Sequence, residues 1–570
     1  MSGLELVLLL LAASVCLRIL AERWRIPYAT LLVLGGLALA EIPHLPRIEL
    51  APDVLFLVFV PPLLYWGAAA FPLRDLRRSS GPILRLAVLM VLVSSVAVAV
   101  VVRAIDPAFT WAAAFTLGAV ISPPDPVAVL SVMRSVRLPR EIERILEGEG
   151  LLNDATALVL YRIAVAAAVT GAFAPATAAL QFLIVGVGGA AIGLAVGVLI
   201  LRLRRLTQRS DVADTTLSLL TPFAAYLAAE SVRCSGVLAV VATGMYVGRN
   251  IQAMLSPASR VQTTSMWTVT THLLESLIFI LVGVELPYIV RHLAPATLAS
   301  LVREAGIVFA CIVVVRLVWL FPSAYVGRKI GRWIRQSHEA PPAWRQILFV
   351  GWAGVRGGDS LVIALALPLA TATGQPFPAR ERIIFITFGV ILASLVLQAP
   401  TLRPLARALD LRADGTVEDE QAHARLVSAE AGLVALDELP RDGVQYPEVL
   451  RYLRQRHLQR ARRWAAEETR RFQDRRSEID HRHFVSSPPS HEAGALDERR
   501  AVEYRRIRSA MIAAERRALL ELRDRAVIGD DVMTTVQHEL DLEQMLLDSA
   551  QPVIEPPSEV HVSADDERVT

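Results

Sequence analysis

The sequence predicts an all-α, polytopic membrane protein with a helical cytoplasmic tail. Of its 570 residues, 54% are apolar, and the mean hydropathy of +0.46 is typical of a chain that crosses a bilayer many times. Apolar runs follow one another from residue 4 to residue 403, and a charged segment follows them. Two of the runs are interrupted by prolines or glycines, which predicts membrane helices that are broken within the bilayer.

The apolar runs predict about thirteen membrane helices. The first run could pass for a signal peptide, but no small-residue cleavage site follows it, so we expect a retained helix. The weakest division separates the eighth and ninth runs around Arg233 and Cys234. The predicted spans are 4–20, 28–42, 53–71, 82–104, 111–133, 148–171, 177–201, 214–232, 235–249, 266–286, 304–326, 345–370 and 382–403.

Basic residues in the loops predict the orientation of the chain. The loops after odd-numbered spans hold most of the arginines, for example at 74–78, 202–209 and 328–335. Short loops rich in Arg and Lys stay in the cytoplasm. We therefore expect an inner or plasma membrane protein with its N-terminus outside and its C-terminal tail in the cytoplasm.

The composition changes near residue 405 and predicts three regions. Residues 1–405 form the membrane domain. Residues 406–550 are charged and show helical patterns near 417–438, 446–473, 498–527 and 530–548, as expected for solvated helices with ion pairs one turn apart. Residues 551–570 have the composition of a disordered end. The tail suits a regulatory or dimer-supporting role, or an appendage without a defined role.

The fifth span contains the run Ile-Ser-Pro-Pro-Asp-Pro at 121–126. Three prolines within four positions remove backbone donors and clash with the preceding turn, so a continuous helix is excluded here. Irregular backbone at membrane depth is tolerated where it lines a cavity, and in transporters it contacts ions. Asp125 can stabilise the N-terminus of the second half-helix. The alternative is a simple proline kink with a capping aspartate.

The sixth span begins with three polar residues, Glu149, Asn153 and Asp154. A carboxylate in a membrane helix is costly and usually marks an ion or proton pathway. Asp154 offers a carboxylate oxygen and Asn153 an amide oxygen, ligands that a small hard cation prefers. A carboxylate that accepts either a proton or a cation is the minimum needed for exchange. The alternative is that these residues lie in a solvated loop before the span.

The twelfth span contains an arginine, Arg356, among five glycines in the stretch 351–360. The glycines permit irregular backbone and close packing. A buried arginine needs an acidic partner, and Glu149 or Asp125 is the expected one; otherwise Arg356 anchors the cytoplasmic end. Breaks at corresponding places in two halves indicate inverted repeats. Spans 1–6 and 8–13 would be the two six-helix repeats.

Four stretches in this order and spacing resemble the monovalent cation:proton antiporter family 1, the bacterial sodium/proton exchangers. They are DPVAVLSVM (125–133), EGEGLLNDATALVLY (147–161), LIFILVGVELP (277–287) and GWAGVRGG (351–358). The resemblance covers about residues 1–405, and the tail from Arg523 to Gln544 also resembles that of bacterial members. It implies transport of a monovalent cation and protons by alternating access, with two broken helices that cross.

The resemblance also implies the site residues. Asp154 matches the aspartate that binds Na⁺ or a proton, and Asn153 its neighbour. The unwound stretch whose backbone oxygens approach the ion contains Ser122 and Pro123.

Glu149 and Arg356 match a buried ion pair that supports the crossing helices. Asp125, Glu275 and Asp359 are possible supporting residues.

The chain departs from the family pattern at three positions. Gly150 and Pro124 each replace a residue that commonly carries a hydroxyl group, and Asp359 is an additional acid where small or apolar residues are usual. These departures bear on cation selectivity and affinity.

Electrogenic relatives combine two adjacent aspartates with a membrane lysine, whereas this chain has Asn153-Asp154 and its one lysine, Lys329, lies in a predicted loop. A single exchanging carboxylate predicts one cation for one proton, without net charge movement.

The sequence therefore predicts a secondary antiporter for Na⁺ or Li⁺ and protons, which forms a homodimer in the bilayer and is not an enzyme. No cofactor or nucleic acid is expected, and the three cysteines suggest neither disulfides nor a metal site. A potassium/proton exchanger would share the mechanism. An intramembrane aspartyl protease would need a G-x-G-D signature, which is absent, and a non-transporting sensor with a signalling tail would leave the broken helices unexplained.

Overall fold

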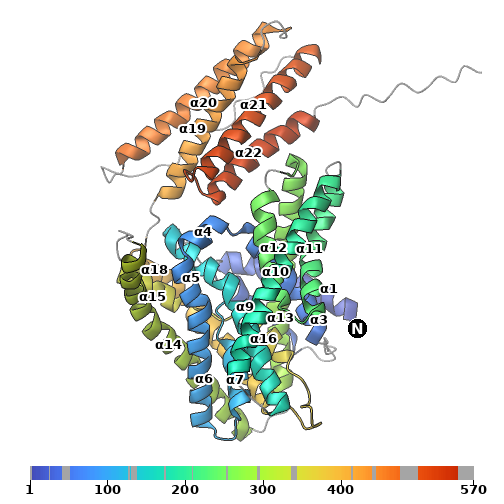
Figure 1. The fold of residues 1–570 in the computed structure, drawn as a ribbon, viewed down its shortest axis with the longest axis vertical. Coiled ribbons are helices and arrows are strands. Elements are labelled where there is room, and N and C mark those ends of the chain that lie inside the picture. The colour runs from blue at the N-terminus through green and yellow to red at the C-terminus, as the bar shows by residue number, and fades with distance from the viewer. Residues whose placement is uncertain are drawn as a thin grey trace, which may run out of the picture. The chain divides into compact units, whose positions relative to one another are not determined.

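The computed structural model describes residues 3–24, 26–41, 52–125, 129, 138–171, 175–207, 210–251, 254–291, 295–335, 343–411, 415–439, 445–474 and 498–549. These residues form helices joined by short loops (Figure 1). The chain divides into two compact units, residues 1–414 and 415–570. The boundary expected at residue 405 falls inside a helix of the first unit, Leu402–Ala408.

The first unit contains the apolar helices, and each apolar run predicted from the sequence overlaps at least one of them. The N-terminal half comprises α1 (Gly3–Trp24), α2 (Tyr28–Leu39), α3 (Pro52–Ala70), α4 (Leu73–Arg78), α5 (Ser80–Leu84), α6 (Val91–Ile105), α7 (Trp111–Ile121) and α9 (Arg140–Thr170). The other half comprises α10 (Pro175–Thr207), α11 (Asp211–Ser231), α12 (Gly236–Ile251), α13 (Pro257–Arg291), α14 (Pro295–Arg335), α15 (Trp344–Trp352), α16 (Gly358–Leu365), α17 (Arg380–Ala393) and α18 (Leu402–Ala408).

Seven of the described helices are long and apolar enough to cross a membrane, and four more are apolar but shorter. The division predicted around Arg233 and Cys234 is confirmed, because α11 ends at Ser231 and α12 begins at Gly236. Arg233 makes this turn with a positive φ of 60°. The total of about thirteen spans and their pairing as inverted repeats stay predictions.

Small residues allow the apolar helices to approach one another closely. On α10, Gly189 and Gly193 face the backbone of Ser235 and Ala239 at the start of α12, where a Cβ would collide with carbonyl oxygens. Thr243 of α12 donates a hydrogen bond to the Gly193 carbonyl, 2.8 Å away. Such contacts between small residues provide helix packing where lipid is as apolar as the side chains.

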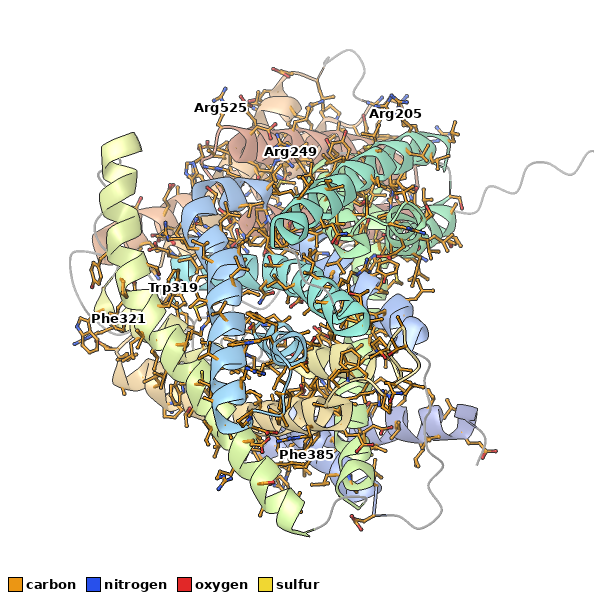
Figure 2. All side chains as sticks on the ribbon, turned by 60° about the horizontal axis from the view of Figure 1, so that its bottom comes forward. Arg205, Arg249, Trp319, Phe321, Phe385 and Arg525 are labelled. Atoms are coloured by element: carbon orange, nitrogen blue, oxygen red, sulfur yellow. The ribbon has the colours of Figure 1, made fainter. Side chains whose placement is uncertain are left out.

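Aromatic residues are few in the chain, and some of them lie on the two packed helices α14 and α17. Figure 2 shows Trp319 and Phe321 on α14 and Phe385 on α17. Phe385 is buried, and α14 packs along α17.

The second unit is a bundle of four charged helices that match the helical patterns predicted from the sequence. They are α19 (Thr416–Asp437), α20 (Pro447–Asp474), α21 (Glu498–Asp524) and α22 (Asp530–Ser549). Two apolar clusters hold the bundle together, one around Ile512 and Val536 and the other around Leu453 and Met511. Residues 551–570, expected to be disordered, lie outside the described residues.

Candidate functional site

The site is organised by two places where helices stop inside the first unit. Helix α7 ends at Ile121, and residues 122–125 are irregular, as the prolines predicted. The continuation of this span lies mostly outside the described residues. The second break separates α15, which ends at Trp352, from α16, which begins at Gly358.

The two breaks are joined by one backbone–backbone and one side-chain–backbone hydrogen bond. The Asp125 amide donates to the Val355 carbonyl over 2.7 Å, and Nε of Arg356 donates to the Ile121 carbonyl over 2.7 Å. A Cβ at Gly357 would collide with the Asp125 carboxylate, so glycine permits this close approach. The contacts satisfy backbone groups that a broken helix leaves unpaired. They bring the two predicted breaks together.

Arg356 serves this crossing rather than the predicted ion pair. Its side chain is buried, and its guanidinium also donates to the Gly354 carbonyl over 2.9 Å. The Ile121 carbonyl that it binds lies at the C-terminus of α7, where the helix dipole is negative and a cation is favourable. Arg356 forms no ion pair with Glu149 or with any other described acid.

The partner of Glu149 is Arg316, a residue of α14 that the sequence analysis did not select. Its two guanidinium nitrogens donate to the two carboxylate oxygens of Glu149 over 2.5 and 2.7 Å. Arg316 also donates to the Val350 carbonyl of α15. The pair is buried, with exposures of 1% for Glu149 and 2% for Arg316. The available signal was a lone arginine inside the apolar run 304–326.

Asn153 connects α9 to the first break. Its side-chain amide donates to the Pro124 carbonyl over 2.8 Å. Its own carbonyl oxygen is buried and has no hydrogen-bond partner among the described residues. A buried acceptor without a donor is costly, so this oxygen suits a ligand or a water molecule. The Ser122 hydroxyl, in contrast, is already hydrogen-bonded. It donates to the Gly118 carbonyl and lies 2.9 Å from the Ser95 hydroxyl.

Asp154 lies beside a small cavity between four helices, with a volume of about 30 Å³. One water molecule needs roughly 10–15 Å³, so the cavity can hold a small ion or water. Seven of the nine lining residues are apolar, and Asp154 of α9 and Asp359 of α16 are the other two. The lining residues are Phe56, Val60, Leu63, Leu64, Asp154, Leu158, Val237, Asp359 and Ile363.

The remaining predicted site residues differ in whether they line this cavity. Asp359 lines the cavity together with Asp154, and Asp125 does not. Asp125 is buried at the helix crossing. Glu275 is partly buried on α13 and does not line the cavity. Neither Pro123 nor Ser122 lines it either.

This geometry defines a membrane transporter built around crossing broken helices and a carboxylate cavity. The model of the family "Sodium/hydrogen exchanger, transmembrane" matches residues 8–408. The chain belongs to this family of cation/proton antiporters.

Known proteins of several organisms are similar to this chain. An uncharacterized Na⁺/H⁺ exchanger of Mycobacterium tuberculosis is 32% identical over 559 residues, covering 96% of this chain and 97% of that protein. A sodium, potassium, lithium and rubidium/H⁺ antiporter of Bacillus subtilis is 33% identical over 410 residues, covering 70% of this chain and 60% of that protein. The structure of the sodium proton antiporter MjNhaP1 of Methanocaldococcus jannaschii matches with a TM-score of 0.53 and 19% identity, over 72% of this chain and 98% of that one. This last likeness confirms the fold.

Proposed function

We propose that the protein exchanges Na⁺ or Li⁺ for protons by alternating access, with Asp154 as the residue at which cation and proton compete. The observation that carries this proposal is the position of Asp154, which lines a small apolar cavity beside the crossing of two broken helices. Its carboxylate has no hydrogen bond or ion pair among the described residues. A carboxylate in such surroundings favours either a proton or a cation as its partner.

The chain neighbour of Asp154, Asn153, supports cation binding close to this place, although it is not one of the residues that line the cavity. The Asn153 carbonyl oxygen is buried without a donor, and oxygen ligands suit Na⁺ and Li⁺. The sodium specificity is supported by the names of the three similar proteins described above, each of which includes sodium. The Bacillus relative also has potassium in its name, so K⁺ belongs in the test.

The test is cation-driven dequenching of a pH-sensitive dye in everted vesicles from an antiporter-deficient strain. Na⁺, Li⁺ and K⁺ are added in turn to vesicles with the wild type, Asp154→Asn, and Asp524→Asn as a matched control. Asp524 is 68% exposed in the tail unit. We expect Na⁺ and Li⁺ to dequench the wild type and the control, and Asp154→Asn to fall to the level of empty vesicles.

Sodium-dependent dequenching that survives in Asp154→Asn would contradict the assignment of Asp154. A response to K⁺ alone would change the substrate and leave the site in place.

We also propose that the N-terminus lies outside and the tail in the cytoplasm. Helices α10 and α12 pack together, and their basic ends, marked by Arg205 and Arg249, lie at the same end of the unit (Figure 2). The positive-inside rule places this end in the cytoplasm. In a cysteine-free background, a membrane-impermeant maleimide should label Ala108→Cys but not Ser549→Cys in intact cells. The reverse pattern would contradict the orientation.

A homodimer is a further proposal. The apolar window of α10 is only 22% buried within one chain, the lowest share among the seven candidate spans. Such a surface suits lipid or a second copy. Cross-linking of cysteines introduced on α10 in native membranes should yield a dimer, and its failure at every exposed α10 position would exclude this interface.

A further inference from the structure

Asp359 faces the same cavity as Asp154 from the opposite helix. It lies in the first turn of α16, and Ile363, one turn later, lines the cavity beside it. Three other helices supply apolar residues, namely α3 with four residues between positions 56 and 64, α9 with Leu158 and α12 with Val237. Among the residues that line this space, Asp154 and Asp359 are therefore the two with polar side chains, and the others are apolar.

The first turn of α16 is a favourable place for the negative charge of Asp359, but the carboxylate has no specific partner in the part of the chain that the structure describes. It has no hydrogen bond or ion pair among the described residues, and the N-terminus of α16 has no side-chain cap. Arg356, three residues earlier, directs its guanidinium to the carbonyls of Ile121 and Gly354. A carboxylate without a partner between apolar walls is costly. Its cost is offset when a cation enters the cavity.

We propose that Asp359 is a second ligand of the transported cation, so that one Na⁺ or Li⁺ is held between the carboxylates of Asp154 and Asp359. This inference rests on the proposed function and adds a residue that sets affinity and selectivity. The carboxylate oxygen of Asp359 replaces a water molecule in the hydration shell of the cation. It favours small cations with high charge density, because selectivity follows cavity size and ligand number.

The experiment measures cation binding as well as transport in the full-length protein. Thermal unfolding in detergent is followed with increasing NaCl, LiCl or KCl, at an ionic strength kept constant with choline chloride. The half-saturating concentration for exchange is measured in everted vesicles. The variants are Asp359→Asn, Asp154→Asn, and Glu304→Gln as a control. Glu304 forms an ion pair with Arg382 over 2.9 Å in the same unit and does not line the cavity.

We expect Asp359→Asn to raise the half-saturating Na⁺ and Li⁺ concentrations by about tenfold or more, since even residues that only support a ligand change metal affinity by roughly 10–100-fold. The increase for K⁺ should be smaller, and stabilisation by Na⁺ should weaken in parallel. Glu304→Gln should unfold at a lower temperature with unchanged cation concentrations. This contrast separates loss of a ligand from loss of stability.

Half-saturating concentrations within twofold of wild type in a folded Asp359→Asn would overturn the inference. If that variant does not fold, Asp359→Glu keeps the charge and moves it by one methylene. It should then alter the order of preference among Li⁺, Na⁺ and K⁺, and an unaltered order would also overturn the inference.

The two proposals fail in different ways. If the wild type shows no cation-driven exchange, or Asp154→Asn keeps the full response to Na⁺, the proposed function fails. If the wild type exchanges, Asp154→Asn does not, and Asp359→Asn behaves as wild type, only the role of Asp359 is wrong.

Discussion

Glu149 and Arg316 show how a buried charge is kept in the interior of the membrane unit. Each guanidinium nitrogen that faces Glu149 meets one of its oxygens, and Arg316 also binds the Val350 carbonyl. Burying either charge alone is expensive, whereas a bidentate pair offsets most of that cost. The pair joins α9, which carries Asp154, to α14 and α15. Its role is therefore to fix the helix that positions the site.

Removal of one partner should destabilise the protein more than removal of both. We expect Arg316→Met to lower the free energy of unfolding by about 3–5 kcal/mol, because the Glu149 charge is left buried and unpaired. The double variant Glu149→Leu/Arg316→Met should recover much of this loss. Thermal unfolding of the purified protein, followed by intrinsic fluorescence, ranks the variants.

Arg162→Met is the matched control for this comparison. Arg162 binds Glu230 over 2.7 Å, but this pair is about one-third exposed. Its loss should cost roughly 0–1 kcal/mol, as is usual for exposed pairs. If Arg316→Met unfolds at the same temperature as Arg162→Met, the buried pair is not a structural anchor.

The partner of Glu149 could not be predicted from the sequence. Arg356 was expected to pair with Glu149 because it stands in a glycine-rich break. The observed partner is Arg316, which is 167 residues away from Glu149 in the chain. Both arginines interrupt apolar runs, so composition does not separate them. The distinction depends on where α14 packs against α9, which is a tertiary property. In contrast, Asp154 could be selected as a candidate from the sequence, because a carboxylate in a membrane helix is rare in any context.

At the scale of elements, the breaks were predicted more reliably than their contacts. Prolines after Ile121 and glycines before Asp359 exclude continuous helices through local backbone chemistry. The hydrogen bonds that join the breaks, from Asp125 to Val355 and from Arg356 to Ile121, require both stretches to be placed. The ends of the tail helices were predicted to within three residues, because amphipathic patterns with ion pairs are local.

The tail bundle contains a buried ionic cluster of its own. Arg508 of α21 donates to Glu515 over 2.5 Å and to Glu543 of α22 over 2.7 Å. His457 of α20 and Glu515 are 3.0 Å apart. Burial acts to raise the pKa of Glu515, but the hydrogen bond with His457 and the charges of Arg508 and Arg460 outweigh it, so the pKa lies below its usual value of 4.5.

The lowered pKa predicts how the tail responds to acid. A carboxylate whose pKa is lower in the folded state contributes stability above its unfolded pKa, and this stability is lost as the pH falls through the folded pKa. Hydrogen exchange of α21 in the intact protein, corrected for intrinsic rates, should therefore accelerate below about pH 4.5. Glu515→Gln should exchange faster at pH 7 and depend less on pH.

Glu521→Gln is the control for the tail experiment, because Glu521 is on the same helix and is 59% exposed. It should behave as the wild type at every pH. An equal pH dependence of Glu515→Gln and the wild type would show that this cluster does not control the acid stability of the bundle.

At the scale of the whole molecule, the sequence specified the class of protein because hydropathy depends on single residues and their neighbours. Each predicted run overlaps a helix, and the family model covers the same region, residues 8–408. The composition of the cavity could not be predicted in this way. Asp154 and Asp359 are far apart in sequence, and only the tertiary arrangement of α3, α9, α12 and α16 around one cavity brings them to one space.

Stoichiometry is the property of the whole transporter that this second carboxylate affects. The one-for-one prediction assumed a single exchanging carboxylate, and the cavity contains two. Asp359→Asn leaves Asp154 as the remaining acid among the lining residues. We therefore expect this variant to exchange one cation for one proton, because a site with one carboxylate carries the same net charge with either ligand.

Proteoliposomes with the purified protein test this expectation. Na⁺-driven proton flux is measured while a thiocyanate gradient imposes a membrane potential of either sign, and moving one net charge through 100 mV changes the free energy by about 2.3 kcal/mol. Flux through Asp359→Asn should not depend on the potential, and dependence on it would contradict a single exchanging carboxylate. In the wild type, the same measurement shows whether the second carboxylate, Asp359, also exchanges protons. A flux that is independent of the potential shows that Asp359 keeps its protonation state through the cycle, and a flux that follows the potential shows that both carboxylates exchange protons for one cation.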